Sequence, residues 1–115
     1  MMNKTFLAAV VFMVFTCSLL LLAAVSEIDG QKVFDGAKCG TCHSVTSAGI
    51  EAKMKSGPMA GSDLTGIGEK HEAKWIASYL RQEVKMDGKA HAKAFKGSDE
   101  ELQALVDWLL EQKSE

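Results

Sequence analysis

The residues best suited to chemistry in this chain form one short run, Cys39-Gly40-Thr41-Cys42-His43. Two thiols three positions apart, followed directly by an imidazole, let one helical turn hold a haem by two thioether bonds while the histidine ligates the iron. The same thiol spacing also occurs in redox dithiols and in half of a zinc site. The run predicts covalent haem attachment through Cys39 and Cys42, with His43 as the proximal axial ligand of the iron.

The rest of the sequence favours haem over the two alternatives. Zinc needs four ligands, and the chain has no cysteine after Cys42, which leaves only His71 or His91 to complete a set. A thioredoxin-like dithiol needs a βαβ setting, and the sequence shows no convincing strand pattern. We therefore expect one covalently bound haem c, with its iron, as the cofactor.

Residues 1–26 have the pattern of an export segment. A single positive charge at Lys4 precedes an apolar stretch over residues 6–25, and small residues before Glu27 fit cleavage of a signal peptide there. The stretch is 20 residues long, which is enough to cross a bilayer core of about 30 Å, so an uncleaved membrane anchor is the alternative. On either topology Lys4 should stay in the cytoplasm, and the remainder is expected on the periplasmic side.

Residues 27–115 are expected to form one small domain. They carry 12 basic and 15 acidic residues, a formal charge of −3. A domain of this size buries only about 60 to 65% of the surface of its unfolded chain, and a covalent haem would supply the missing apolar core. The domain has only two thiols, Cys39 and Cys42, so no disulfide framework can stabilise it in place of the haem. The mild acidity argues against nucleic acid as a partner, because binding it would call for a basic stripe with interleaved aromatics.

Helices and loops are expected to position the motif. Three segments show helical patterning, namely Gly30 to the haem motif, 69–84, and Ser98 to about residue 110. Asp29 is the expected N-cap of the first helix. Ser98 and Glu101 form a capping box at the start of the last. Segments 44–63 and 86–96 are expected loops, the first wrapped over a haem edge. The predicted fold is all-α, with about three helices and loops around one covalent haem, and no sheet.

From about Gly30 to Leu110 the chain resembles a small class I cytochrome c, the single-haem, all-helical electron carriers. The most specific part of this resemblance is the motif from Cys39 to His43. The supporting pieces are Gly30 and Phe34, Gly57-Pro58, the stretch 63–68, Trp75-Ile76 and the stretch 98–101. In that family the first and last helices cross at close range. The resemblance places Gly30, Phe34, Leu105 and Trp108 at this crossing.

The resemblance also implies contacts and ligands for the haem. Pro58 resembles the proline whose carbonyl accepts the N–H of the proximal imidazole, and Trp75 resembles the aromatic beside a haem propionate. The Met-Pro that usually supplies the sixth ligand is missing. His91, 7 residues before Ser98, is our first choice for this ligand, and Met86, 12 residues before it, is the alternative, with an open site as a third possibility. Met54 and Met59 are expected to cover the haem edge as loop residues, and His71 is expected to be exposed.

The function implied is transfer of single electrons between redox partner proteins, with no small-molecule substrate. Catalysis is not expected, because His43 is committed to iron and the chain shows no Ser/His/Asp arrangement. A histidine as sixth ligand would give a lower reduction potential than a methionine. Two alternatives stay open. One is a haem-based gas or redox sensor with a labile sixth ligand, and the other is an electron-entry subunit of a larger membrane oxidoreductase.

Overall fold

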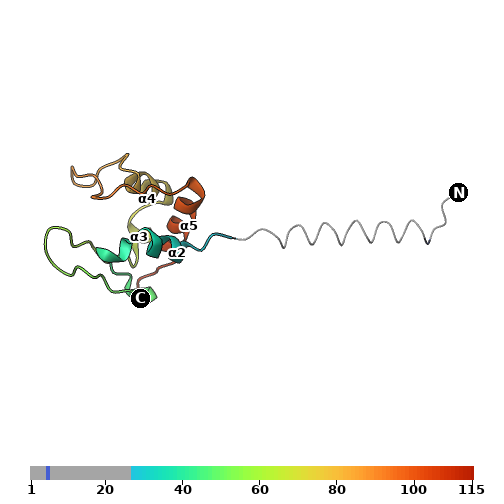
Figure 1. The fold of residues 1–115 in the computed structure, drawn as a ribbon, viewed down its shortest axis with the longest axis horizontal. Helices are drawn as coiled ribbons and strands as arrows, with labels where there is room; N and C mark the ends of the chain where they lie inside the picture. The colour runs from blue at the N-terminus through green and yellow to red at the C-terminus, as the bar shows by residue number, and fades with distance from the viewer. Residues whose placement is uncertain (1–4, 6–26) are drawn as a thin grey trace.

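The chain folds back on itself so that its first and last described helices lie together (Figure 1). The structure is a computed structural model that describes residue 5 and residues 27–115. The predicted signal peptide or anchor over residues 1–26 lies outside the described residues, apart from Thr5. Within the part that is described, no helix has the length and apolar character needed to cross a membrane.

Helices provide all the regular structure of residues 27–115, and only two isolated bridges, Val45 with Ile50 and Met86 with Lys89, have β character there. The elements are α2 (Gly30–Gly36), the 3₁₀ turns η1 (Cys39–Thr41) and η2 (Thr46–Ala48), α3 (Ile67–Lys70), α4 (Ala73–Leu80) and α5 (Asp99–Leu110). The predicted all-α class is confirmed.

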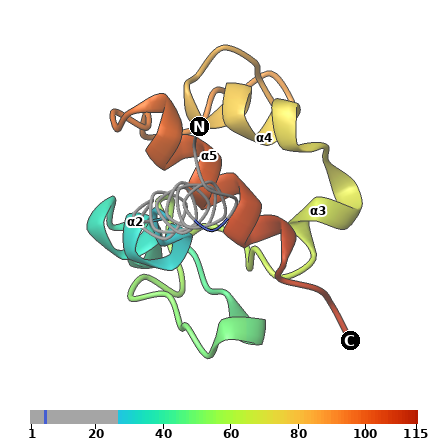
Figure 2. The ribbon, with the colours of Figure 1, turned by 90° about the vertical axis from the view of Figure 1, so that its right-hand side faces the viewer.

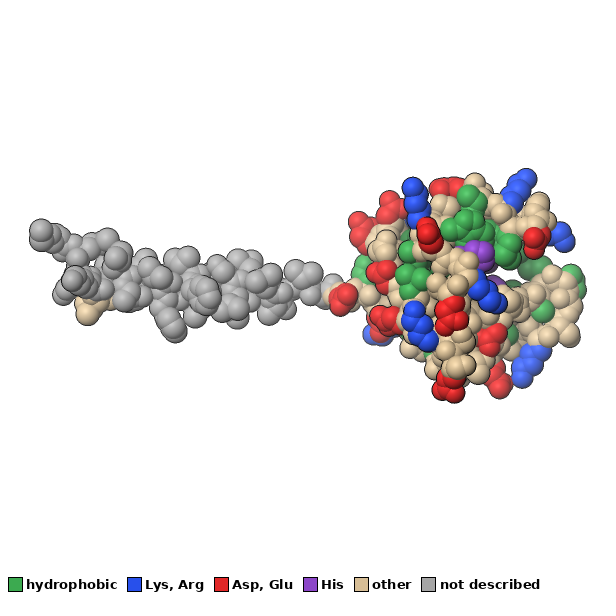
Figure 3. All heavy atoms as spheres, turned by 180° about the vertical axis from the view of Figure 1, so that it is seen from behind, with side chains coloured by type: hydrophobic (Ala, Val, Ile, Leu, Met, Phe, Trp, Pro, Cys, Tyr) green, Lys and Arg blue, Asp and Glu red, His purple; other side chains and the backbone are tan. Residues whose placement is uncertain are grey.

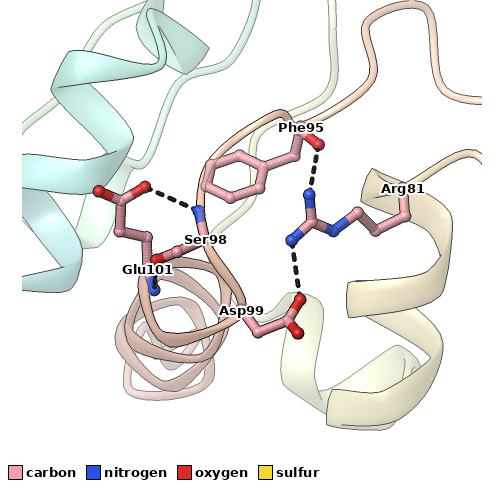
Figure 4. A network of polar contacts seen from close by, with 5 residues as sticks. All are labelled: Arg81, Phe95, Ser98, Asp99 and Glu101. Carbon is pink, nitrogen blue, oxygen red and sulfur yellow. Dashed lines mark hydrogen bonds and ion pairs between the residues drawn. The ribbon is translucent and has the colours of Figure 1, made fainter.

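Both predicted helix caps are confirmed. The Asp29 carboxylate accepts hydrogen bonds from the N–H groups of Gln31 at 2.9 Å and Lys32 at 3.3 Å. At the start of α5, Ser98 Oγ accepts from the Glu101 N–H, and the Glu101 carboxylate accepts from the Ser98 N–H, each at 3.1 Å (Figure 4). These bonds satisfy backbone donors that a helix start leaves without partners.

Helices α2 and α5 cross at close range, as predicted (Figure 2). A Cβ on Gly30 would lie 2.2 Å from the Ala104 carbonyl oxygen, so only glycine permits this approach. The Phe34 ring fills the crossing, with its centroid 5.2 Å from that of Trp108. The buried core around it comprises Phe34, Val45, Ile76, Leu102, Leu105, Val106 and Leu109. The core therefore lies beside the haem motif, which follows α2 directly.

The single helix predicted over 69–84 is wrong, because the structure has two shorter helices there. The chain leaves helical geometry at His71 and Glu72, which are both extended, before α4 begins. Helix α4 then ends at Leu80, since Gln82 adopts a left-handed φ of 62°. A side-chain contact lies at each break. His71 stacks on Trp75 at the first, and the Gln82 side chain donates to the His91 carbonyl at the second.

Candidate metal centre

A tight turn gathers the residues of the Cys39 to His43 motif. Lys38 has a left-handed φ of 59°, and the N–H groups of Cys42 and His43 both donate to the Cys39 carbonyl, at 3.2 and 3.0 Å. Both thiols are free and half-buried. Burial raises the pKa of the Cys39 thiol, and the Lys93 ammonium opposes that rise. The motif is thus a compact unit of two thiols and an imidazole.

A glycine and a backbone carbonyl hold the His43 ring from one side. His43 Nδ1 donates to the Ser62 carbonyl at 2.7 Å. The Gly61 N–H donates to the Cys42 carbonyl at 2.8 Å. A Cβ at Gly61 would lie 2.5 Å from His43 Cε1, so the chain packs flat against the imidazole.

This arrangement corrects the role expected for Pro58. The carbonyl that accepts the His43 N–H belongs to Ser62, and Pro58 is exposed. The reason is a turn closed by the bond from the Ala60 N–H to the Gly57 carbonyl, which places Pro58 at the loop tip. A contact between Pro58 and haem remains a prediction.

The protonation state of His43 suits a metal ligand. A carbonyl oxygen can only accept, so Nδ1 carries the proton and Nε2 of the neutral ring keeps its lone pair. Burial lowers the pKa of His43, the bond to Ser62 opposes this, and the nearby His91 lowers it further. The neutral ring with a free Nε2 is the form that binds iron.

His91 is held in the same way from the other side. Its Nδ1 donates to the Lys93 carbonyl at 2.6 Å, which again leaves the lone pair on Nε2. The Gln82 amide donates to the His91 carbonyl at 2.6 Å. Lys93 Nζ donates to the Ala37 carbonyl at 3.3 Å and so ties this loop to the end of α2.

The His43 and His91 rings lie nearly parallel, at a centroid spacing that fits one metal ion between them. Their centroids lie 6.0 Å apart and their planes differ by 11°. An imidazole nitrogen lies about 1 Å from its ring centroid and binds a first-row metal at about 2 Å, so two imidazoles flanking one ion place their centroids about 6 Å apart. Histidine side chains are visible in a hollow of the domain surface (Figure 3). The donor set and the spacing both fit an iron between the two rings.

The Cytochrome c family model matches residues 28–113. The chain belongs to the cytochrome c family. The resemblance to small class I cytochromes is therefore confirmed. The family carries electrons on a haem attached through cysteines, and this cytochrome has Cys39 and Cys42 in place for that attachment. Searches of curated proteins and of solved structures found no match.

The segment 81–97 of this cytochrome, here called the distal loop, carries His91 and is fixed at both ends. Arg81 Nη1 donates to the Phe95 carbonyl at 2.9 Å, and Nη2 lies 3.0 Å from a carboxylate oxygen of Asp99 (Figure 4). The Phe95 N–H donates to the Leu80 carbonyl at 2.8 Å. The guanidinium also lies 5.4 Å from the Phe95 ring centroid, within the range of a cation–π contact. These bonds attach the loop to α4 and α5.

The other candidate, Met86, lies at an exposed turn of the distal loop. Met86 and Lys89 exchange two backbone hydrogen bonds around Asp87 and Gly88, which both have positive φ. The Met86 side chain is 42% exposed. Met54 and Met59 are 38% and 49% exposed, and their expected role of covering the haem edge remains a prediction.

His71, which precedes α4, differs from the expectation. His71 is half-buried and not simply exposed, because its ring stacks on Trp75 with a centroid distance of 3.9 Å. Trp75 also stacks on Tyr79, and their ring centroids lie 4.9 Å apart. A contact of Trp75 with a haem propionate remains a prediction.

Sequence reasoning did not find four of the residues that contact the two imidazoles. They are Gly61, Ser62, Tyr79 and Lys93. Ser62 and Lys93 act through backbone carbonyls, which any residue type supplies. Of the four, only Tyr79 could have been found from the sequence, since it follows Trp75 by four positions on α4.

Proposed function

We propose that this cytochrome is a one-electron carrier with a single haem c, bound through Cys39 and Cys42 and ligated by His43 and His91. The observation that carries the proposal is the pair of parallel imidazoles 6.0 Å apart, each with Nδ1 committed to a carbonyl. Met86 is the less suitable distal ligand because its side chain lies on an exposed turn.

Haem iron supplies the chemistry when it is bound, by changing between the ferric and ferrous states. His43 and His91 would both hold the iron and would thereby exclude oxygen, peroxide and other small ligands. The carbonyls of Ser62 and Lys93 raise the basicity of the two imidazoles by accepting their N–H protons. Bis-histidine ligation favours a reduction potential below that of a histidine and methionine pair. The protein binds no small-molecule substrate in this proposal, and electrons pass to and from redox partner proteins.

The test is the visible and near-infrared absorption of the oxidised, haem-loaded protein, with His91→Ala and Met86→Ala as matched variants. We expect a low-spin spectrum without the red charge-transfer band of methionine ligation. His91→Ala should become high-spin, and Met86→Ala should match the parent. A red band lost only in Met86→Ala would overturn the assignment of His91.

Carbon monoxide separates this carrier from a haem-based gas sensor. Added to the ferrous protein, it should leave the spectrum unchanged, because His91 is held through its ring, its carbonyl and the ends of the distal loop. His91→Ala is the positive control and should bind the gas. Rapid binding to the parent protein would favour the sensor.

We further propose that the domain functions in the periplasm, following export directed by residues 1–26. Their charge and apolar pattern support either a signal peptide cut before Glu27 or an anchor through residues 6–25. Mass spectrometry of the haem-loaded protein from its native host distinguishes the two. A mass that starts at Glu27 means a soluble carrier. The full-length mass in the membrane fraction would favour a tethered subunit that delivers electrons to a membrane oxidoreductase.

A further inference from the structure

Three aromatic rings on α4 and the residues before it form a row that ends on His91. His71 and Trp75 stack at 3.9 Å with planes 14° apart, and Trp75 and Tyr79 stack at 4.9 Å with planes 16° apart. Tyr79 then meets the His91 ring nearly at right angles, at 5.3 Å and 73°. The spacing of four residues keeps Trp75 and Tyr79 on one side of α4, and His71 precedes the helix. Binding of iron by His43 and His91 does not by itself require this row.

The row restrains the orientation of the His91 ring in a way that its hydrogen bond does not. The Lys93 carbonyl holds one ring nitrogen at 2.6 Å, but a single bond leaves the ring free to rock about that contact. The perpendicular Tyr79 ring limits that rocking. Trp75 and His71 in turn back Tyr79, since each stacked pair has nearly parallel planes. Aromatic pairs of this kind contribute about 0.5 to 1.5 kcal/mol beyond their buried area.

We infer that Tyr79, backed by Trp75 and His71, is a positioning residue that keeps the plane of His91 nearly parallel to that of His43. This inference rests on the proposed ligation by both histidines. The relative orientation of two axial imidazoles sets the energy difference between the iron d orbitals of π symmetry. Parallel planes separate these orbitals and perpendicular planes bring them together. Tyr79 would therefore tune the electronic state of the iron without touching it.

Electron paramagnetic resonance of the frozen, oxidised, haem-loaded protein reads this orientation directly. With planes 11° apart, we expect a low-spin rhombic signal with resolved g values. Tyr79→Leu should move the signal toward the single large-g feature of crossed planes, or broaden it into a mixture. Tyr79→Phe keeps the ring and should restore the parent signal. A parent signal retained in Tyr79→Leu would overturn the inference.

Two further variants separate positioning from simple loss of stability. Trp75→Leu removes the backing of Tyr79 but leaves the Tyr79 ring, so it should shift the g values in the same direction. It also serves as the test if Tyr79→Leu fails to take up haem, and an unchanged signal would then refute the inference. Trp108→Phe, in the crossing of α2 and α5, should lower stability and leave the g values unchanged. Methionine ligation in the parent optical spectrum would refute the proposed function instead.

Discussion

At the scale of single residues, Gly61 is the position where the smallest change should disturb the metal centre. Gly61→Ala places a methyl group 2.5 Å from the His43 ring, and the ring must shift because the other near atom is backbone. We expect a loss of about 1 to 3 kcal/mol in the free energy of unfolding. We also expect a partial high-spin signal in the oxidised spectrum. Denaturant unfolding and optical absorption of the haem-loaded protein measure the two effects.

Gly36 is the matched control for this prediction. Nothing lies within 4 Å of a Cβ built there, and Gly36 is a helical residue of α2. Gly36→Ala should therefore be neutral or stabilise the protein by up to about 1 kcal/mol through helix propensity. Equal losses in the two variants would show that the Gly61 contact with His43 is not the cause.

What the sequence reveals at this scale depends on whether a side chain or the backbone acts. The sequence singles out Cys39, Cys42 and His43 because thiols and imidazoles at that spacing have few other uses. His91 could be proposed from its place before α5, but not chosen decisively over Met86. Assigning the accepting carbonyl to Pro58 was wrong. Which carbonyl accepts the His43 N–H depends on where the loop turns, and residue type does not indicate this.

At the scale of elements, the loop over residues 44–63 is closed by one carboxylate. Asp63 accepts bonds from the Thr46 hydroxyl, from the Thr65 N–H at 2.9 Å and from the Thr46 N–H at 3.3 Å. The Thr46 hydroxyl and then the Thr65 N–H lower the pKa of Asp63 from 3.8 to about 2. Because the folded pKa is the lower one, the charged form favours the folded state above about pH 4. That contribution is lost as the pH falls from about 4 to about 2.

Asp63→Asn should therefore lower the melting temperature at neutral pH and lower it by about half as much near pH 3. Thermal unfolding of the oxidised, haem-loaded protein at about pH 6 and about pH 3 measures this difference. Thr46→Val removes the hydroxyl but keeps both N–H donors, so it should have an intermediate effect. A difference between parent and Asp63→Asn that is the same at both pH values would contradict the prediction.

Elements could be predicted where local signals decide them. The caps at Asp29 and Ser98 and the buried face of α5 follow from local residue patterns, and the structure has them. The helix predicted over 69–84 fails at two breaks, after Lys70 and after Leu80. The bond from the Gln82 side chain to the His91 carbonyl leaves no signature in helical periodicity. Val45, fully buried in a predicted loop, was missed for the same reason.

At the scale of the whole molecule, charge is distributed unevenly. The distal loop has five basic and two acidic residues, a net charge of +3. The segment 98–115, with α5, has one basic and six acidic residues, a net charge of −5. The exposed lysines of the loop are Lys85, Lys89, Lys93 and Lys96. A redox partner that approaches His91 thus meets positive charge on a domain whose net charge is −3.

The salt dependence of electron transfer tests whether the local charge or the net charge prevails. Ferricyanide, an anion, should oxidise the ferrous protein several-fold more slowly as ionic strength rises above about 0.1 M, where the screening length falls below about 10 Å. Tris(phenanthroline)cobalt(III), a cation, should show the opposite trend. Replacing Lys85 and Lys89 by Gln should flatten both dependences, whereas Lys113→Gln, beyond α5, should not. A ferricyanide rate that rises with salt would mean that net charge prevails, and that electrons do not leave past the distal loop.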